Sequence, residues 1–234
     1  MQAGDLLRIL KQALKFCRVR KYAISHEIDD LSVGDVGKKP NRRDRVLTNN
    51  ELHDVWYFVN KEYDNRIMSH EYRVILRFLI IFGCRLSEIL LSTWDEWDFV
   101  NNIWRVPPEH SKNGREIIRP IPDNFKNWLL LLNQSTKNRK YVIGFDIGVC
   151  TVSAAISKIW KKLKHKEKWT AHDMRRVLAT NLSDNGFEHN VVEQLLGHTL
   201  GGVAGIYNRS KYMDRKKEAL DWWVDYLDSL LKLG

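Results

Sequence analysis

The sequence has very little cysteine. Its 234 residues include only Cys17, Cys84 and Cys150, which are far apart and contain no CxxC pair. An odd number of widely spaced cysteines excludes a disulfide framework and a zinc knuckle. Reduced thiols of this kind are typical of a cytosolic protein, so the sequence predicts a cytoplasmic location.

Long apolar runs are also lacking. Uncharged stretches such as "FLIIFGC" at 78–84 are much too short to cross a bilayer. Basic residues recur through 1–22 and leave no clean signal-peptide core: Arg8, Lys11, Lys15 and Arg18. We therefore expect a soluble, intracellular protein that does not contact a membrane.

Carboxylates that could converge on a metal are missing as well. The acidic residues near the chemically interesting positions are scattered, and no DxD signature is present: Glu88, Asp173 and Glu193. A zinc site made of Cys84, His172 and His198 is conceivable, but these residues lack a recognisable ligand spacing. The sequence thus predicts no metal and no other cofactor.

Aromatic residues and positive charge are plentiful. The chain is 44% hydrophobic, with nine Trp, eight Tyr and eight Phe, which suffices for a substantial core and excludes a disordered chain. The 38 Lys and Arg residues exceed the 29 Asp and Glu residues, giving a formal net charge of +9. Such a balance favours a polyanionic partner, most commonly nucleic acid, although it could also serve solubility alone.

The chain divides into three parts. Apolar residues at helical spacing predict an amphipathic helix over 4–19, within an N-terminal part that spans 1–31. Residues 32–46 are rich in Gly, Pro and charge and indicate a linker with a basic bias. Thr48 and Glu51 then form a predicted capping box, which opens an ordered domain over 47–234.

Within that domain the pattern is mainly helical. Helices are predicted over 69–82, from Leu86 onward, over one continuous stretch at 152–163, from near His172, from near Glu188 with Asn185 or a neighbour as N-cap, and over the C-terminal segment. Aromatic and β-branched residues flank Asn101-Asn102 and predict a hairpin over 93–107, with a third strand at 115–122. The predicted class is mainly α with a small antiparallel β-sheet (α+β).

Four places carry residues suited to chemistry. Arg85 and Glu88 lie one helical turn apart, which could equally be a surface ion pair worth a few tenths of a kcal/mol. Lys112 lies beside a turn, where an ordinary exposed lysine is common. His172 and Arg175 project from one side of a helix start, a weak signal alone. His198 and Tyr207 flank "TLGGVAGI", whose adjacent glycines allow close approach of the backbone, and Tyr207 could instead fill a core.

Together these groups match phosphoryl transfer without a metal. Two guanidinium groups suit the neutralisation of non-bridging phosphate oxygens. Imidazoles exchange protons near neutrality, a lysine can protonate a leaving alkoxide, and a tyrosine can attack to form a covalent intermediate. The arginines would supply the charge stabilisation that Mg²⁺ provides in most nucleases.

In order and spacing these residues resemble the catalytic domain of the tyrosine recombinases, and more narrowly the integrases of phages and genomic islands. The resemblance runs over about 45–230 and is clearest in "HDMRRVLATNLSDNG" followed by "VVEQLLGHTLGGVAGIYNRSKYMDRKKEALDWW". It implies that fold, and an enzyme that cleaves and rejoins DNA through a 3′-phosphotyrosyl intermediate without metal or ATP. The nine residues from His198 to Tyr207 favour Tyr207 over Tyr212 as the nucleophile.

The resemblance also implies roles for the other residues. Arg85 and Arg175 would hold the scissile phosphate, with His198 as a further hydrogen-bond donor. Lys112 would be the general acid, His172 would assist proton transfer, and Glu88 would steady the site. "FGCR" stands where Thr-Gly-Leu-Arg is more usual, and we expect Cys84 to fill the apolar place of the leucine.

Partners and domain context follow from the same resemblance. Residues 1–31 resemble the last helix of a core-binding domain that is otherwise missing, so we expect a fragment. The implied partners are duplex DNA bearing an attachment site and other protomers of a synaptic tetramer, in a bacterial cytoplasm. The C-terminal helix is a candidate protomer contact through Trp222 and Trp223, unless these tryptophans pack in their own core.

Several alternatives stay open at this stage. A lysine-rich stretch could follow the DNA backbone or be a solvated helix face, and its candidate contacts are Lys158, Lys161, Lys162 and Lys164. A DNA relaxer similar to the type IB topoisomerases would use comparable chemistry. A non-catalytic DNA-binding remnant of a decayed element is the remaining alternative, against which the complete set of site residues counts.

Overall fold

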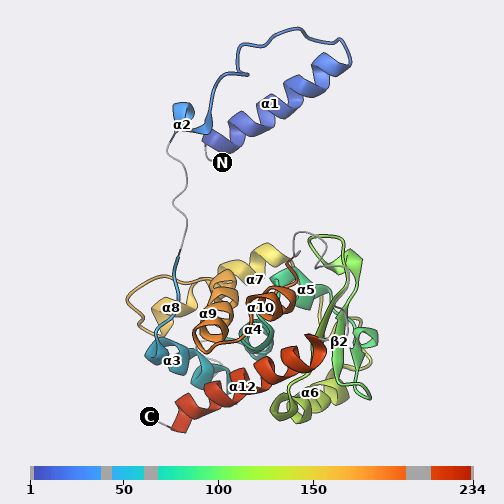
Figure 1. Cartoon of the computed structure of the whole chain (residues 1–234), viewed down its shortest axis with the longest axis vertical. Coiled ribbons are helices and arrows are strands. Elements are labelled where there is room, and N and C mark those ends of the chain that lie inside the picture. The colour runs from blue at the N-terminus through green and yellow to red at the C-terminus, as the bar shows by residue number, and fades with distance from the viewer. Residues whose placement is uncertain (1–2, 38–43, 61–67, 199–211, 233–234) are drawn as a thin grey trace. The chain divides into compact units, whose positions relative to one another are not determined.

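A computed structural model describes residues 3–37, 44–60, 68–198 and 212–232 of the chain (Figure 1). The chain forms two compact units, Met1–Asp44 and Arg45–Gly234, which we call unit 1 and unit 2. Tyr207 and the rest of 199–211 lie outside the described residues. Each unit is described by itself below.

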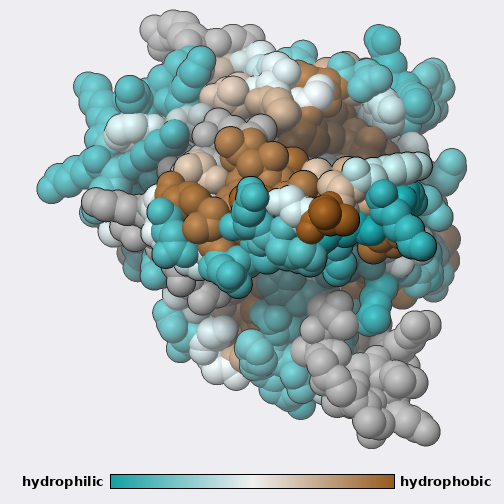
Figure 2. All heavy atoms as spheres, turned by 90° about the horizontal axis from the view of Figure 1, so that it is seen from above, coloured by the Kyte–Doolittle hydropathy of each residue, from teal (hydrophilic) through white to brown (hydrophobic). Residues whose placement is uncertain are grey.

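Unit 1 contains α1 (Ala3–Val19) and the short helix α2 (Val33–Val36), which contacts α1. The predicted helix over 4–19 is therefore confirmed. The stretch predicted as a linker differs from a plain irregular segment, because it begins with α2 and because Arg45 and Val46 belong to unit 2. Most large apolar side chains of α1 stay exposed, and hydrophobic surface is visible as brown patches in Figure 2.

Unit 2 is mainly helical, with a small antiparallel sheet, as predicted. Its described α-helices are α3 (Asn49–Asn60), α4 (His70–Phe82), α5 (Leu86–Leu91), α6 (Asp123–Thr136), α7 (Val149–Ile156), α8 (Ile159–Lys162), α9 (Ala171–Asp184), α10 (His189–Leu195) and α12 (Tyr212–Lys232). Its strands are β1 (Trp97–Asp98), β2 (Ile103–Val106) and β3 (Ile117–Pro120), and the 3₁₀ turns are η1 (Trp94–Glu96) and η2 (Pro108–His110).

The sheet has the order β1-β2-β3, with both pairs antiparallel. Trp97 lies opposite Trp104, and Ile103 lies opposite Pro120. Asn102 adopts a φ of 54°, a left-handed conformation that asparagine tolerates better than most residues. The predicted hairpin at 93–107 and the predicted third strand are thus confirmed.

Helix α4 forms the centre of the core. Nine of its residues are buried, and it contacts α3, α5, α7, α9 and α12 (Figure 1). A helix that is apolar on most of its circumference has to be covered on several sides, which explains this position. The capping box that opens α3 is also confirmed, since Thr48 N–H donates to Glu51 Oε2 at 2.9 Å and Glu51 N–H donates to Thr48 Oγ1 at 3.3 Å.

Two local predictions were wrong. The helix predicted over 152–163 is interrupted at Ser157 and Lys158, so that α7 and α8 are separate. The N-cap of α10 is Glu188, whereas Asn185 caps the C-terminus of α9 by donating from its own N–H to the Asn181 carbonyl at 3.2 Å. The first error is a missed interruption inside a helix, and the second is a misplaced helix start.

Helix α12 packs its apolar face inside unit 2. Trp223 is fully buried, and its indole N–H donates to the Ile80 carbonyl on α4 at 3.0 Å. Trp222 is partly buried and stacks on Tyr226, with centroids 5.3 Å apart. Of the two alternatives for Trp223, a protomer contact or packing in its own core, the structure supports the second.

Lys216 is a buried cation at the start of α12. Its side chain is 5% exposed, and Nζ donates to the Ile118 carbonyl on β3 at 2.7 Å. Burial, assisted by the nearby charge of Arg119, lowers the pKa of Lys216 from 10.5 to about 8. The Lys216 hydrogen bond thus connects α12 to the sheet, whereas the burial of Lys216 disfavours its charged form.

This burial predicts an unusual pH dependence of stability. Between about pH 8 and 10.5 the unfolded chain keeps the Lys216 proton while the folded chain loses it, so wild-type stability should rise with pH. Relative to Lys216→Met, the free energy of unfolding should improve by about 1 kcal/mol from about pH 7 to 9. Urea denaturation at the two pH values measures this difference.

Lys217→Met is the matched control on the same helix. Burial lowers the pKa of Lys217, but the hydrogen bonds and charges of Asp123 and Asp221 together outweigh burial and raise the pKa. The contribution of Lys217 to stability should therefore be complete at neutral pH and decrease only in the alkaline range. This pH dependence has the opposite sign to that of Lys216. Parallel pH dependences of the wild type and Lys216→Met would show that Lys216 is not desolvated.

Candidate functional site

Arg85 stands at the junction of α4 and α5. Gly83 ends α4 with a φ of 53°, and an added Cβ would lie 2.6 Å from Leu178 Cδ2, so glycine is required here. Arg85 is the N-cap residue of α5, and its Nη1 donates to Glu88 Oε1 at 2.9 Å. Glu88 is fully buried, so the alternative of a surface ion pair is wrong.

Cys84 fills an apolar place beside this junction. Its side chain is buried, and its Sγ lies 3.7 Å from the Phe78 carbonyl oxygen. Burial raises the pKa of the Cys84 thiol to about 12, so the group stays protonated. A protonated, inaccessible thiol acts as a small hydrophobic residue, which agrees with the expectation for the "FGCR" stretch.

Arg175 reaches the same junction from α9. Its Nη1 donates to the Gly83 carbonyl at 2.9 Å, and its Nη2 donates to the Leu196 carbonyl. The side chain is buried, which lowers the pKa of Arg175 to about 10, and the charges of Arg85 and Arg119 add to this effect. Arg175 nevertheless keeps its charge at neutral pH.

His172 lies on the first turn of α9. Partial burial of the ring, followed by the charges of Arg175 and Arg176, lowers its pKa. The imidazole is therefore neutral at physiological pH and can accept a proton. The charge of Arg85 also lowers the pKa of His172. The two site residues predicted on α9, His172 and Arg175, therefore both lie close to the Arg85 junction.

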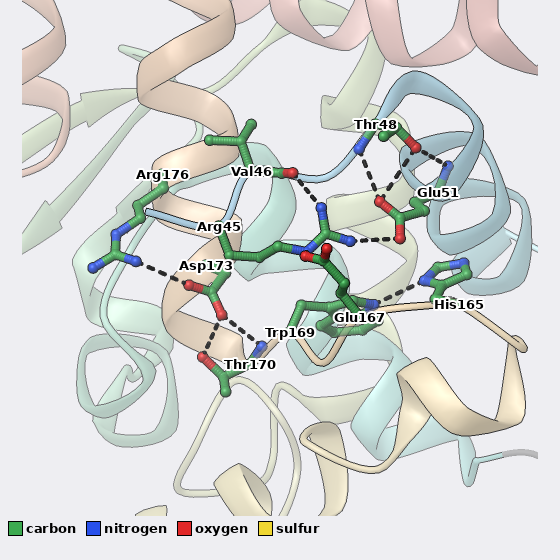
Figure 3. Close-up of polar contacts among 10 residues, drawn as sticks. All are labelled: Arg45, Val46, Thr48, Glu51, His165, Glu167, Trp169, Thr170, Asp173 and Arg176. Carbon is green, nitrogen blue, oxygen red and sulfur yellow. Dashed lines mark hydrogen bonds and ion pairs between the residues drawn. The ribbon is translucent and has the colours of Figure 1, made fainter. Parts of the chain in front are cut away.

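A polar network fixes the N-terminal end of α9 (Figure 3). Asp173 accepts hydrogen bonds at 2.8 Å from both the backbone N–H and the hydroxyl of Thr170, and it pairs with Arg176 at 3.3 Å. The Trp169 indole N–H donates to His165 Nδ1 at 2.9 Å within the preceding segment. The capping box holds the first turn of α9, and thereby His172, in place.

Arg45 fastens the start of unit 2 to the segment that leads into α9 (Figure 3). Its guanidinium pairs with Glu51 on α3, and its Nε lies 3.2 Å from Glu167 Oε2. The predicted linker included this residue, but its side chain is largely enclosed in unit 2. Arg45 thus links the beginning of α3 to the loop before α9.

The end of α10 and the loop before β3 meet near the same place. Gly197 has a φ of 65°, and an added Cβ would collide with the Ile117 side chain on β3. Asn113 Nδ2 donates to the Gly197 carbonyl at 3.4 Å, which brings the Lys112 loop beside His198. Lys112 and His198 are exposed, and His198 Nδ1 lies 2.8 Å from Glu193 Oε2.

The described residues therefore bring five predicted site positions together. Arg85 and Arg175 share the Gly83 junction, His172 lies within their electrostatic influence, and the Lys112 loop contacts the segment that carries His198. The sixth, Tyr207, lies outside the described residues. The four candidate backbone contacts, Lys158, Lys161, Lys162 and Lys164, are exposed in and around α8, apart from the buried groups.

Arg119 on β3 is not among the site residues predicted from the sequence. This residue is completely buried, donates to Glu88 Oε2 at 2.7 Å and to the Leu195 carbonyl at 2.7 Å, and lies over the Trp104 ring at 5.0 Å. A signal existed, because Arg119 shares the inward face of the strand with Ile117. A charged residue at an apolar position in a strand indicates a buried partner.

Comparisons with known proteins identify what this arrangement is similar to. The profile of the phage integrase family matches residues 45–213. Prophage integrase IntA of Escherichia coli strain K12 is 26% identical over 165 residues, which cover 68% of this chain and 39% of IntA. Tyrosine recombinase XerD of Lacticaseibacillus casei is 25% identical over 217 residues, covering 87% of this chain and 71% of XerD.

Solved structures establish the fold. A lambda integrase(75-356) dimer bound to a COC′ core site superposes with a TM-score of 0.65 at 16% identity, covering 84% of this chain and 71% of that chain. The Tn1549 transposon integrase in complex with transposon right end DNA gives a TM-score of 0.60 at 18% identity, covering 83% of this chain and 70% of that chain. The match covers only 39% of IntA and 41% of the integrase of Shigella phage Sf6.

Proposed function

The chain belongs to the phage integrase family, and from that premise we propose that it acts as a site-specific DNA recombinase. In this proposal it cleaves and rejoins DNA strands through a covalent link between Tyr207 and a 3′-phosphate, and it integrates or excises a prophage or genomic island. Energy stored in that link would make ATP unnecessary, and the charges of the protein would replace a metal.

The observation that carries this proposal is a surplus of enclosed positive charge. The buried carboxylate of Glu88 pairs with Arg85 and Arg119, and Arg175 adds a third guanidinium that interacts with it electrostatically. Buried charges are stable only when they are compensated, so this arrangement favours an incoming anion. A phosphodiester suits it, because guanidinium groups bind phosphate oxygens in a fork geometry.

The proposed reaction assigns one task to each group. The phenolic oxygen of Tyr207 attacks phosphorus while the bond to the 5′-oxygen breaks. The Tyr207 proton passes to His172, whose lowered pKa keeps it neutral and ready to accept, and the Lys112 ammonium protonates the departing 5′-oxygen. Arg85 and Arg175, with a hydrogen bond from His198, stabilise the charge on the non-bridging oxygens. Attack by a different 5′-hydroxyl reverses the sequence and joins a new strand.

The partners proposed are duplex DNA and further copies of the protein. The exposed lysines around α8 would contact phosphates along the duplex without reading its sequence. Contacts between protomers through α12 would use residues of this helix that are not buried in the core, such as the half-buried Trp222. Unit 1 would belong to a core-binding domain, and the activity would take place in the bacterial cytoplasm.

A covalent trapping assay in EDTA tests the proposal. The protein is mixed with nicked duplexes that carry the DNA ends of the element encoding it, and products are separated on a denaturing gel. We expect a DNA-linked protein band, and peptide mapping should locate the link at Tyr207. Scrambled duplexes should give much less product. Efficient relaxation of any supercoiled plasmid, without preference for the element ends, would favour the topoisomerase-like alternative, and the absence of any covalent product would contradict the proposal.

A further inference from the structure

We propose that Arg119 is a positioning residue for the Arg85 guanidinium and for the end of α10 that precedes His198. This inference rests on the proposed function. It assigns to a strand residue, which does not itself touch DNA, the task of holding two separate parts of the phosphate site in register.

Glu88 connects Arg119 to Arg85. Its carboxylate is fully buried and its two oxygens have separate partners, Arg85 on Oε1 and Arg119 on Oε2. A carboxylate held on both oxygens cannot rotate, so the direction in which it holds Arg85 is fixed. With Arg119 removed, the carboxylate could turn, and the Arg85 guanidinium would lose its defined orientation.

Arg119 also binds the end of α10. Arg119 Nε donates to the Leu195 carbonyl at 2.7 Å, and Arg175 Nη2 donates to the next carbonyl, that of Leu196. Two buried arginines from different elements thus hold consecutive carbonyls just before Gly197 and His198. These groups lie at a helix C-terminus, where donors are needed for unpaired carbonyls.

The burial of Arg119 excludes a direct role in DNA contact. The Arg119 side chain is completely enclosed and lies over the Trp104 ring at 5.0 Å. A group with no exposed surface cannot reach a phosphate of bound DNA in this arrangement. Its influence must pass through Glu88 and the α10 carbonyl, which makes it a positioning residue and not a catalytic one.

The electrostatics give a readout that a purely structural residue would not affect. Burial alone would raise the pKa of the Glu88 carboxyl, but Arg119 first and Arg85 next outweigh burial, and the pKa lies below its ordinary value. Arg175 and the protonated Cys84 thiol also face this carboxyl. With the Arg119 charge gone, Glu88 should bind a proton at higher pH and release Arg85.

The test compares Arg119→Met and Arg119→Lys with a control on the same sheet, Arg105→Met. Arg105 on β2 forms an exposed ion pair with Glu116, which directly precedes β3. Single-turnover cleavage of nicked duplexes is measured across pH, together with DNA affinity. Arg119→Met should lower the cleavage rate by about 10²-fold, since small misplacements of reacting groups have effects of this size. DNA affinity should stay close to wild type, and the acidic limb of the pH profile should move to higher pH.

The variants separate positioning from folding. Arg119→Lys restores the charge and should return the acidic limb toward wild type, but one ammonium cannot serve both Glu88 and Leu195, so the rate should recover only in part. Glu88→Gln combined with Arg119→Met should be little slower than Arg119→Met alone, because the part of the effect that passes through Glu88 is already lost. Should Arg119→Met fail to fold, Arg119→Lys and Glu88→Gln carry the same comparison.

The possible failures can be told apart. A wild-type protein that forms no covalent DNA product contradicts the proposed recombinase, and the role of Arg119 with it. An active wild type with Arg119→Met indistinguishable from Arg105→Met in rate and pH profile overturns only the role of Arg119. Additive effects of Glu88→Gln and Arg119→Met would likewise overturn it, because independent residues add.

Discussion

Replacing Tyr207 by phenylalanine should abolish the covalent DNA complex. The substitution removes only the phenolic oxygen, which is the proposed nucleophile. DNA affinity should remain within about 1 kcal/mol of wild type, the size of a single hydrogen bond. Denaturing gels measure the covalent product, and a native gel-shift titration measures affinity.

Tyr212→Phe is the matched control. Tyr212 is the first residue of α12 and packs partly buried against the core of unit 2, so its ring has a structural task that phenylalanine can perform. This variant should keep the covalent product at a rate close to wild type. The reverse pattern, with product lost in Tyr212→Phe and kept in Tyr207→Phe, would assign the attack to Tyr212 and contradict the spacing argument.

The fold was predictable where local chemistry decides it. The capping pair Thr48 and Glu51, the helix over 69–82 and the turn at Asn101-Asn102 each depend on residues a few positions apart. Such signals survive tertiary packing because the same side chains satisfy the same backbone groups in isolation and in the folded chain. Their outcome therefore needs no knowledge of distant segments.

Predictions failed where one sequence pattern is compatible with two local structures. Val152, Ile156 and Ile159 are all buried, so the apolar face continues although the helix breaks at Ser157 and Lys158. Periodicity records which side faces the core and is blind to such an interruption. Asn185 has the right chemistry for an N-cap, yet its amide Nδ2 donates back to the Asn181 carbonyl at the end of α9.

The site was predictable as positions but not as a charge balance. The spacing of the motifs identified Arg85 and Glu88 but not the burial of Glu88 or its second partner. That partner, Arg119, is 31 positions away in sequence and meets Glu88 only because the sheet brings it there. Burial of a carboxylate is a property of the whole fold, so the sequence left open whether the Arg85 pair was on the surface. In the structure Arg85 is one of three arginines that interact with the buried Glu88 carboxylate.

Arg175→Ala should slow covalent complex formation by roughly 10³-fold or more, the effect expected when a guanidinium is removed from a phosphoryl transition state. The change also leaves the carbonyls of Gly83 and Leu196 without their donor, at a cost of about 1–3 kcal/mol each if they stay buried. The rate must therefore be expressed per folded molecule, with thermal unfolding followed in parallel. Arg175→Lys keeps a charge but not the fork, so it should recover stability more than rate.

Lys161→Ala is the control that separates chemistry from DNA tracking. Lys161 is exposed at the end of α8, where its ammonium lies 5.5 Å from the Trp160 ring centroid. Removing the Lys161 side chain should leave the cleavage rate at saturating DNA nearly unchanged. The slope of log binding constant against log salt concentration should fall by about the amount that one phosphate contact contributes. Arg175→Ala should show the opposite pattern, because a buried guanidinium acts on the scissile phosphate and adds little to the long-range attraction of the duplex. Equal loss of cleavage in both variants would mean that the lysines around α8 and the buried arginines serve a single task, and the division between them would be wrong.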